Sequence, residues 1–406
     1  MNCRHCSEKL KSTFLDLGFQ PPSNAYLSFE DLKKPEIYFP LKIYVCDICW
    51  LVQTEDYSNS DVFFTEDYAY FSSISSSWLK HAKEYCEMIT KRVDLDEESF
   101  VVEVASNDGY LLKNFVAAGI PCLGIEPTDS TAKVAEEQGI PVIREFFGKT
   151  FAEKQFTARK ADLILGNNVY AHVPDINDFT AGLKEALKVT GTITLEFPHL
   201  LRLIELNQFD TVYHEHYSYL SLQVVQRIFK KAGLRVFDVD ELSTHGGSLR
   251  IYGCHMEDER ENNFNVEAVL SAECDAGLQN LSTYINFQPK AEKVKNDLLL
   301  FLLEQKIKGK KVIAYGAAAK GNTVLNYAGV QSDLLEFVCD AAPSKQEKYL
   351  PGSHIPIVDP SCLQGLAVDY VLILPWNLAD EISHQLDYLR EKGTKFVSAV
   401  PELRIF

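Results

Sequence analysis

Residues 100–111 read FVVEVASNDGYL, and this stretch decides the fold. The apolar run Phe100–Ala105 predicts a buried strand, and Leu111–Ala118 has the apolar spacing of a helix. A short polar turn with a single glycine joins the two. In doubly wound α/β domains a strand passes through such a turn into a helix, and ligands bind at the carboxyl ends of the strands. We therefore expect an α/β domain built outward from this unit.

Strand and helix alternate from Ser99 to about Cys254. Four further strands are predicted at Pro121–Glu126, Val142–Phe146, Asp162–Gly166 and Thr192–Phe197. A last pair, separated by a Gly-Gly turn and expected to be antiparallel, is Arg235–Leu242 and Gly247–Tyr252. Helices are predicted at Ser76–Arg92, at Ile176–Lys188 and from near Leu222. The order indicates a doubly wound domain with a hairpin at its end.

The turn after the first strand is acidic and has the residue types that hold a nucleoside cofactor. Its candidate contacts are Glu103, Ser106, Asn107, Asp108 and Gly109. The second strand ends in Glu126, which could accept hydrogen bonds from both ribose hydroxyls. No G-x-G-x-x-G follows a strand here, which disfavours a dinucleotide. S-adenosylmethionine (SAM) fits better, because a cationic cofactor tolerates an acidic turn.

Two C-x2-C pairs near the N-terminus predict a zinc site. They are Cys3 with Cys6 and Cys46 with Cys49, and 39 residues separate the pairs. Four thiolates complete a tetrahedral Zn²⁺ site and leave no open coordination position, so the ion should be structural. The alternative is four unpaired thiols. The chain between the pairs should fold as a small hairpin-rich insert.

Residues 209–222, FDTVYHEHYSYLSL, concentrate groups that exchange protons near neutral pH. Tyr213, His214, Glu215 and His216 are consecutive, and they follow the predicted strand Thr192–Phe197. A further histidine, His172, follows the neighbouring strand, and Asn168 lies just before it. Loops at the carboxyl ends of such strands build active sites, so we expect these side chains to meet in one crevice.

The C-terminal part contains a second strand, glycine-containing turn and helix. Residues 310–322 read KKVIAYGAAAKGN, and strands are expected at Phe337–Cys339 and Tyr370–Leu374. The helix Ala291–Lys306 should connect this smaller Rossmann-like unit to the rest. Lys320 and the amides of the turn could hold a diphosphate, although the turn has neither a dinucleotide nor a P-loop fingerprint. Trp376 and Asn377 end another strand at the same edge.

A segment rich in tyrosine and serine precedes the first long helix. Its candidate ligand contacts are Tyr68, Tyr70, Ser72 and Ser75. Hydroxyls and free amides at a helix N-terminus suit a phosphate group. The other interpretation is a linker whose aromatic side chains pack on the next domain.

Bulk properties limit the partners. The net charge of −17 argues against nucleic acid and anionic membrane surfaces. The sequence begins MNCRHC, without the apolar core of a signal peptide, and no run of 18 apolar residues occurs. We expect a cytoplasmic protein with thiols or metal ligands rather than disulfides, active as a monomer or small homo-oligomer. Its length of 406 residues predicts two or three domains.

Several motifs together resemble one enzyme family. They are the paired C-x2-C, EVASNDGYLL, FPHL, YHEHYSYLSL, GGSLRIY and YGAAAKGNT, in this order along nearly the whole chain. The sequence is similar to SAM-dependent nucleotide-sugar C-methyltransferases, which make C-3-methyl-branched deoxysugars. The resemblance implies a zinc-binding module over residues 1–66, a SAM-binding Rossmann-like domain over 67–285 and a Rossmann-like sugar-nucleotide domain over 286–406.

The resemblance also implies a reaction and a division of roles. The substrate would be a dTDP-4-keto-deoxysugar, whose C-3 proton is removed to leave an enolate that takes the methyl group. His216 would be the base, Tyr213 and Glu215 would orient it and the sugar, and His172 would hydrogen-bond the oxyanion. The cofactor contacts would be Ser106, Asn107, Asp108, Gly109 and Glu126, with Asn168 as a further candidate. The sugar nucleotide would be held by Tyr68, Tyr70, Ser72, Ser75, Lys320 and Asn322.

Three other functions are compatible with parts of the pattern. An O- or N-methyltransferase acting on a nucleotide sugar or another small metabolite would keep the cofactor and change the acceptor atom. A non-catalytic sugar-nucleotide-binding protein would not need the intact acidic turn and the proton-handling loop. A nicotinamide-dependent enzyme is disfavoured because the fingerprint is missing.

Overall fold

A computed structural model describes residues 1–57 and 72–406, and it contains three sheets. The largest has the strand order β10-β11-β8-β7-β4-β5-β6. Its strands are β4 Val101–Val104, β5 Cys122–Ile125, β6 Val142–Ile143, β7 Ala161–Asn167, β8 Leu187–Pro198, β10 Leu234–Leu242 and β11 Ser248–His255. β4 to β8 are parallel, and β11 pairs antiparallel with both β8 and β10. The predicted doubly wound sheet with a terminal hairpin is confirmed.

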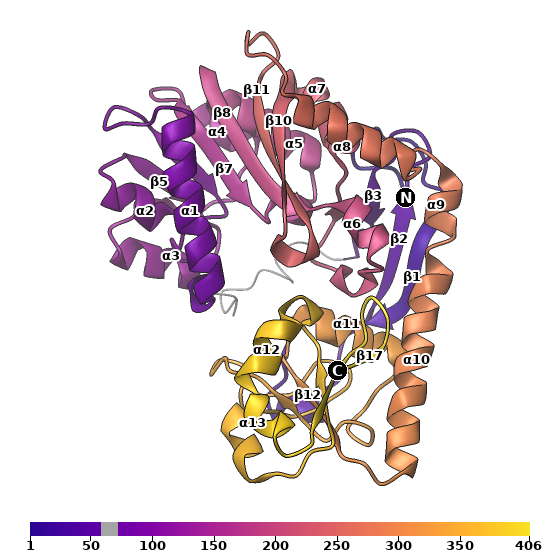
Figure 1. The fold of residues 1–406 in the computed structure, drawn as a ribbon. Helices are drawn as coiled ribbons and strands as arrows, with labels where there is room; N and C mark the ends of the chain where they lie inside the picture. The colour runs from indigo at the N-terminus through magenta and orange to yellow at the C-terminus, as the bar shows by residue number, and fades with distance from the viewer. Residues whose placement is uncertain (58–71) are drawn as a thin grey trace.

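Helices cover both faces of this sheet (Figure 1). They are α1 Ser76–Arg92, α2 Leu112–Ala117, α3 Asp129–Glu137, α4 Lys149–Gln155, α5 Ile176–Ala186 and α7 Leu222–Ala232. The short helix α6 Leu200–Glu205 packs instead in the core shared by the N-terminal sheet and the C-terminal unit. Serine side chains cap the N-termini of two of these helices. Ser75 accepts a hydrogen bond from the Trp78 amide, and Ser221 accepts one from the Val224 amide. The helix expected over Ile176–Lys188 ends two residues early, because Leu187 and Lys188 begin β8.

The N-terminal part forms a four-stranded sheet of order β1-β2-β3-β9. Its strands are β1 Ser12–Gln20, β2 Phe39–Val45, β3 Val52–Thr54 and β9 Ser218–Tyr219. The fourth strand comes from the loop that follows β8, so the N-terminal sheet includes part of the predicted catalytic loop. Val52 pairs with Tyr219, and Gln53 with Ser218. The N-terminal module is thereby hydrogen-bonded to the loop after β8.

The C-terminal part contains a six-stranded sheet of order β14-β13-β12-β15-β16-β17. Its strands are β12 Val312–Tyr315, β13 Val338–Cys339, β14 Ile357–Val358, β15 Tyr370–Ile373, β16 Lys395–Ser398 and β17 Arg404–Ile405. The helices around and before it are α8 Phe264–Asp275, α9 Leu281–Ile285, α10 Gln288–Ile307, α11 Ala319–Ala328, α12 Ala379–Gln385 and α13 Asp387–Arg390. β12 to β16 are parallel, and the predicted second Rossmann-like sheet is confirmed.

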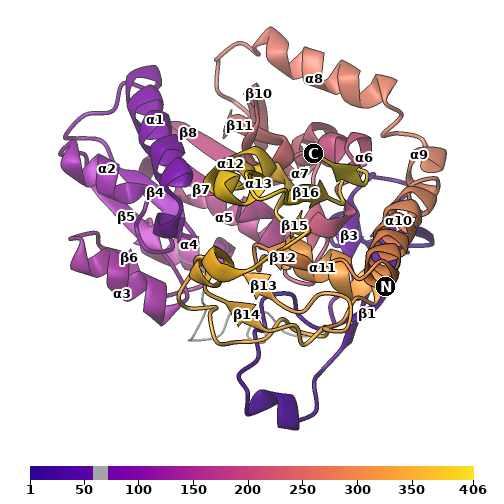
Figure 2. The ribbon, with the colours of Figure 1, turned by 60° about the horizontal axis from the view of Figure 1, so that its bottom comes forward.

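The three parts share cores. In Figure 1, α10 runs beside β1 and reaches down to the C-terminal unit. The two elements also lie side by side in Figure 2. One continuous cluster of buried side chains joins the N-terminal sheet to the C-terminal unit and includes Phe14, Leu298 and Leu325. A second cluster joins the cysteine pairs to the helices of the large sheet. Among the described residues no helix is long and apolar enough to cross a membrane.

Candidate active site and zinc centre

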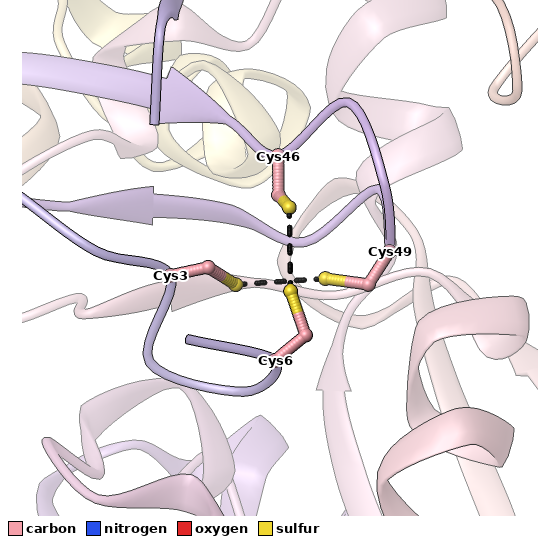
Figure 3. Close-up of side chains that lie close together, drawn as sticks. All are labelled: Cys3, Cys6, Cys46 and Cys49. Carbon is pink, nitrogen blue, oxygen red and sulfur yellow. Dashed lines mark hydrogen bonds between the residues drawn. The ribbon is translucent and has the colours of Figure 1, made fainter. Parts of the chain in front are cut away.

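The four N-terminal cysteines converge on one point (Figure 3). The sulfur atoms of Cys3 and Cys49 are 3.5 Å apart, as are those of Cys6 and Cys46, and all four lie within 4.8 Å of one another. Tetrahedral Zn²⁺ with Zn–S bonds of about 2.3 Å requires sulfur–sulfur distances of this size. None of the four is in a disulfide. The cluster therefore fits a Zn²⁺ ion with no open coordination position, as predicted.

The turn after β4 presents buried polar atoms that the protein itself does not satisfy. Both carboxylate oxygens of Glu103 are buried without a hydrogen-bond partner, and so are Ser106 Oγ and Asp108 Oδ1. Burial, with the charges of Glu126 and Asp108, raises the pKa of Glu103 well above its ordinary value. Buried groups of this kind need a partner. A cationic ligand with hydroxyl and amino donors would supply one, so the residues present fit SAM.

The carboxylate of Glu126 is held against this turn. It accepts a hydrogen bond from the backbone N–H of Asn107 at 2.9 Å and others from the amide and hydroxyl of Thr128. Asn107 has the left-handed φ of +49°. From the other side, the Ser72 amide donates to Asn107 Oδ1 and the Ser73 amide to Asp108 Oδ2, each at 3.0 Å. Ser72 thus lies at the turn after β4.

Gly109 allows this turn to pack closely against Ala135 of α3 and against Ile140, which follows that helix. Its φ is +76°, and a Cβ there would lie 2.3 Å from Ile140 Cδ1. Gly109→Ala should destabilise the fold by about 2–4 kcal/mol, from backbone strain plus overpacking, and weaken SAM binding. Gly139→Ala is the matched control, because φ is +79° there and no atom lies within 4 Å. Thermal melts and calorimetry with SAM measure both effects; equal losses in the two variants would contradict the packing argument.

The loop after β8 places His216 beside Tyr213. Their rings are 4.0 Å apart, and His216 is buried. Its Nδ1 lies 3.0 Å from the carbonyl oxygen of Thr211, which can only accept. Nδ1 therefore carries the proton, and the neutral ring leaves a lone pair on Nε2, which has no hydrogen-bond partner among the described residues. Burial, together with the neighbouring His172, Lys320 and His245, lowers the pKa of His216 well below its ordinary value.

His172 meets His216, as expected, with ring centres 4.6 Å apart. Its Nδ1 donates to the Glu215 carbonyl at 2.9 Å, and burial lowers its pKa to about 4. In this neutral tautomer Nε2 is an acceptor, so donation to an oxyanion would require a second proton on the ring. His214 points elsewhere: its ring packs edge-on against Phe39 of β2 at 5.9 Å.

Glu215 is buried and held from the N-terminal module. Asn24 donates from Nδ2 to both carboxylate oxygens, at 3.0 and 2.8 Å. Burial raises the pKa of Glu215 to about 7 despite this hydrogen bond. The side chain therefore gains or loses its proton near neutral pH and lies one residue before His216.

Glu215→Gln should change how stability depends on pH. Because the pKa is raised from 4.5 to about 7, the folded protein binds a proton here that the unfolded chain has released. The proton on Glu215 contributes fully to the free energy of unfolding below the pKa of the unfolded chain. This contribution, about 3 kcal/mol, is lost as the pH rises through about 7. Melts between about pH 5 and pH 8 should show the wild type losing Tm relative to the variant. A Tm difference independent of pH would contradict the assignment.

The C-terminal unit contributes Lys320 to the same region. Its ammonium lies 4.6 Å over the ring of Trp376 and 3.1 Å from Asn377 Oδ1. Its charge acts on His216, His245 and Asp210.

Asn322 is more than nine-tenths buried, and its Nδ2 donates to the Ser23 carbonyl at 2.6 Å, so this amide joins the C-terminal unit to the N-terminal module. Ser75 caps α1, and Tyr68 and Tyr70 lie outside the described residues.

Sequence reasoning missed three residues of this region. Asn24 holds Glu215 from 191 residues away, and no local pattern marks it. His245 lies in the turn between β10 and β11 with φ of +54°, and its Nε2 is 3.1 Å from Nδ2 of Asn168. A histidine before Gly-Gly at a strand end was the available signal. Asp210 is buried and lies within residues 209–222, but in the sequence it stood out only as a polar residue in an apolar context.

The comparisons with known proteins agree with this architecture. Three family models match in order: a zinc binding domain over residues 3–64, a methyltransferase domain over 78–239 and a C-methyltransferase C-terminal domain over 243–401. C-methyltransferase NovU of Streptomyces niveus is 33% identical over 404 residues, covering 99% of this chain and 96% of the relative. The chain belongs to the C-methyltransferase family. This C-methyltransferase is a SAM-dependent enzyme with an N-terminal zinc-binding module.

Two solved structures align with part of the C-methyltransferase. The PH0226 protein from Pyrococcus horikoshii OT3 is 12% identical with a TM-score of 0.39, covering 46% of this chain and 94% of its own. A SAM-dependent methyltransferase from Clostridium acetobutylicum ATCC 824 is 11% identical with a TM-score of 0.36, covering 44% and 92%.

Proposed function

We propose that the protein methylates C-3 of a dTDP-4-keto-deoxysugar, with His216 as the base. The observation that carries this proposal is the tautomer of His216. Its Nδ1–H is committed to the Thr211 carbonyl, and Nε2 keeps a lone pair with which to remove a proton. Hydrogen atoms on carbon are acidic enough for such a base only next to a carbonyl group, which favours a keto sugar over an alcohol.

The low pKa of His216 suits a substrate that carries negative charge. In the free enzyme, burial and nearby positive groups disfavour the imidazolium. A bound diphosphate and a developing enolate would both raise its pKa, because opposite charge stabilises the protonated ring. The base therefore becomes strongest when substrate is bound. SAM, held at the turn after β4, would supply the electrophilic methyl group that the enolate carbon attacks.

Lys320 is the proposed partner of the enolate oxygen. His172 was expected to donate this hydrogen bond, but its Nδ1–H is engaged with the Glu215 carbonyl and its pKa is low. The Lys320 ammonium group acts electrostatically on His216, although burial lowers the pKa of Lys320. A fixed cation beside a developing oxyanion usually contributes much of the stabilisation of the transition state. His172 then orients the loop through the Glu215 carbonyl, and Tyr213 packs against the base.

The sugar nucleotide would lie between the large sheet and the C-terminal unit. Its proposed contacts are Tyr68, Tyr70, Ser72, Ser75, Lys320 and Asn322. We further propose that residues 1–66, 67–285 and 286–406 are the zinc-binding, SAM-binding and sugar-nucleotide-binding parts. The cofactor contacts proposed are Glu103, Ser106, Asn107, Asp108, Gly109, Glu126 and Asn168.

Methyl transfer from ¹³C-methyl SAM to candidate dTDP-4-keto-deoxysugars tests the proposal. The product should contain a new methyl group bonded to C-3, identified by the multiple-bond coupling of its protons to the ring carbons in an NMR spectrum. A methyl ether or an N-methyl product would refute it and support transfer to oxygen or nitrogen instead. Solvent deuterium should enter C-3 when SAM is replaced by S-adenosylhomocysteine, because proton removal precedes methyl transfer.

A further inference from the structure

Asp210 is a buried carboxylate that the C-terminal unit reaches directly. It is fully buried, and its Oδ2 accepts a hydrogen bond from the indole Nε1 of Trp376 at 2.8 Å. Trp376 begins a short helical turn, Trp376–Leu378, after β15. Burial raises the pKa of Asp210 to about 6, while the charge of Lys320 and the indole N–H oppose this rise. Burying a carboxylate is unfavourable unless it is hydrogen-bonded, so the Trp376 contact is important to this turn.

The turn that contains Asp210 also holds His216. Phe209–Thr211 form one 3₁₀ turn, and the Thr211 carbonyl accepts the hydrogen bond from His216 Nδ1 at 3.0 Å. Thr211 Oγ donates to the Gln208 carbonyl at 2.7 Å and closes the turn. A movement of Asp210 would therefore move the adjacent carbonyl that fixes the orientation and tautomer of His216.

Helix α11 holds the same turn at a second place. Thr323 Oγ donates to the Val212 carbonyl at 3.0 Å, and the Phe209 ring packs edge-on against Tyr327 at 5.8 Å. Residues 209–212 are thus fixed from the C-terminal unit by a helix and by the turn that carries Trp376.

The Trp376 ring is itself held in one orientation. Lys320 lies over one face, and a Cβ on Gly246 would come within 2.4 Å of Trp376 Cη2. Gly246 has a φ of +90° and belongs to the turn that carries His245. The indole therefore fills a gap between two loops of the large sheet while its N–H points at Asp210.

We propose that Trp376 and Asp210 are positioning residues, through which the C-terminal unit orients the imidazole of His216. The inference rests on the proposed function of His216 as the base. In this arrangement the C-terminal Rossmann-like unit does more than bind a nucleotide: it sets the geometry of proton removal.

The test measures the NMR signal of the His216 imidazole N–H in ¹⁵N-histidine-labelled, zinc-loaded protein. The signal is assigned by its loss in His216→Asn. Trp376→Phe keeps the aromatic packing and removes the N–H donor. Asp210→Ala removes the acceptor, whereas Asp210→Asn keeps an acceptor oxygen. Trp50→Phe is the control, because the Trp50 ring stacks on Tyr284 of α9 and not on Asp210. Melting curves show that each variant is folded.

The Nδ1–H signal should be present in the wild type, Asp210→Asn and Trp50→Phe, and be lost to solvent exchange in Trp376→Phe and Asp210→Ala. With a dTDP-4-keto-deoxysugar as substrate, kcat in the latter two should fall by about 10–100-fold, with little change in KM for SAM. A wild-type signal and kcat in both would overturn the proposal. Loss of the signal with unchanged kcat would support the positioning role and overturn the assignment of His216 as base.

Discussion

His216→Asn is expected to lower kcat by about 10²–10⁴-fold while leaving SAM affinity nearly unchanged. The amide of asparagine can still donate to the Thr211 carbonyl, so the loop keeps its anchor, but it has no lone pair that accepts a proton near neutral pH. The turn after β4, which is proposed to hold SAM, is a different loop from the one that contains His216. Steady-state kinetics and calorimetry with SAM measure the two quantities.

Exchange with solvent separates proton removal from methyl transfer. In deuterated water the wild type should introduce deuterium at C-3 of the substrate, and His216→Asn should not. His214→Asn is the matched control, because its ring packs on Phe39 of β2 and lies outside the proposed machinery. Retained exchange in His216→Asn would assign the base to another group, with Glu215 as the first candidate because its pKa is about 7.

The pH profile of kcat/KM carries the same information. Because this ratio reports the free enzyme, its acidic limb should lie well below the ordinary pKa of histidine if His216 is the base. A limb near pH 7 would instead indicate Glu215. Asp210 and His172 also change charge below neutrality, so comparison with Glu215→Gln identifies the group responsible.

The fold could be predicted because local patterns and tertiary structure agree. The run VVEV is buried throughout β4, and the helix predicted over Ser76–Arg92 has these bounds in the structure. The helix predicted at Ile176–Lys188 was extended too far, and it ends where its apolar pattern continues into a strand. A continuous apolar run does not mark where a helix ends and the next strand begins.

The site could be predicted only where its residues are neighbours in sequence. Tyr213 to His216 were conspicuous as a cluster, and the structure brings His172 to them because parallel strands end at one edge of a sheet. Asn24 and Trp376 join the region through contacts across 191 and 166 residues, which no local pattern encodes. The tautomers of His172 and His216 depend on which carbonyl faces each ring, and this is a tertiary property.

Removal of zinc should abolish turnover although the ion takes part in no chemical step. Cys46→Ser, or chelation, is expected to unfold the N-terminal module, because binding of a structural Zn²⁺ commonly supplies about 10–16 kcal/mol in small domains. The consequence reaches His216 through three contacts. Arg4, between two zinc ligands, donates to the Thr54 carbonyl at 2.8 Å. Thr54 in turn donates from its amide to the Tyr217 carbonyl at 3.1 Å and from Oγ to the His216 carbonyl at 3.3 Å.

Zinc content, kcat and hydrogen exchange at β9 would be measured together. Loss of the ion should deprotect Ser218 and Tyr219, because their strand pairs with β3, and kcat should fall in parallel. Cys254→Ser is the matched control, since this buried thiol lies outside the cluster. SAM should still bind, because the turn after β4 makes its contacts within the large sheet and with residues 72–73. A zinc-free Cys46→Ser protein with wild-type kcat would show that the loop after β8 holds its geometry without the module.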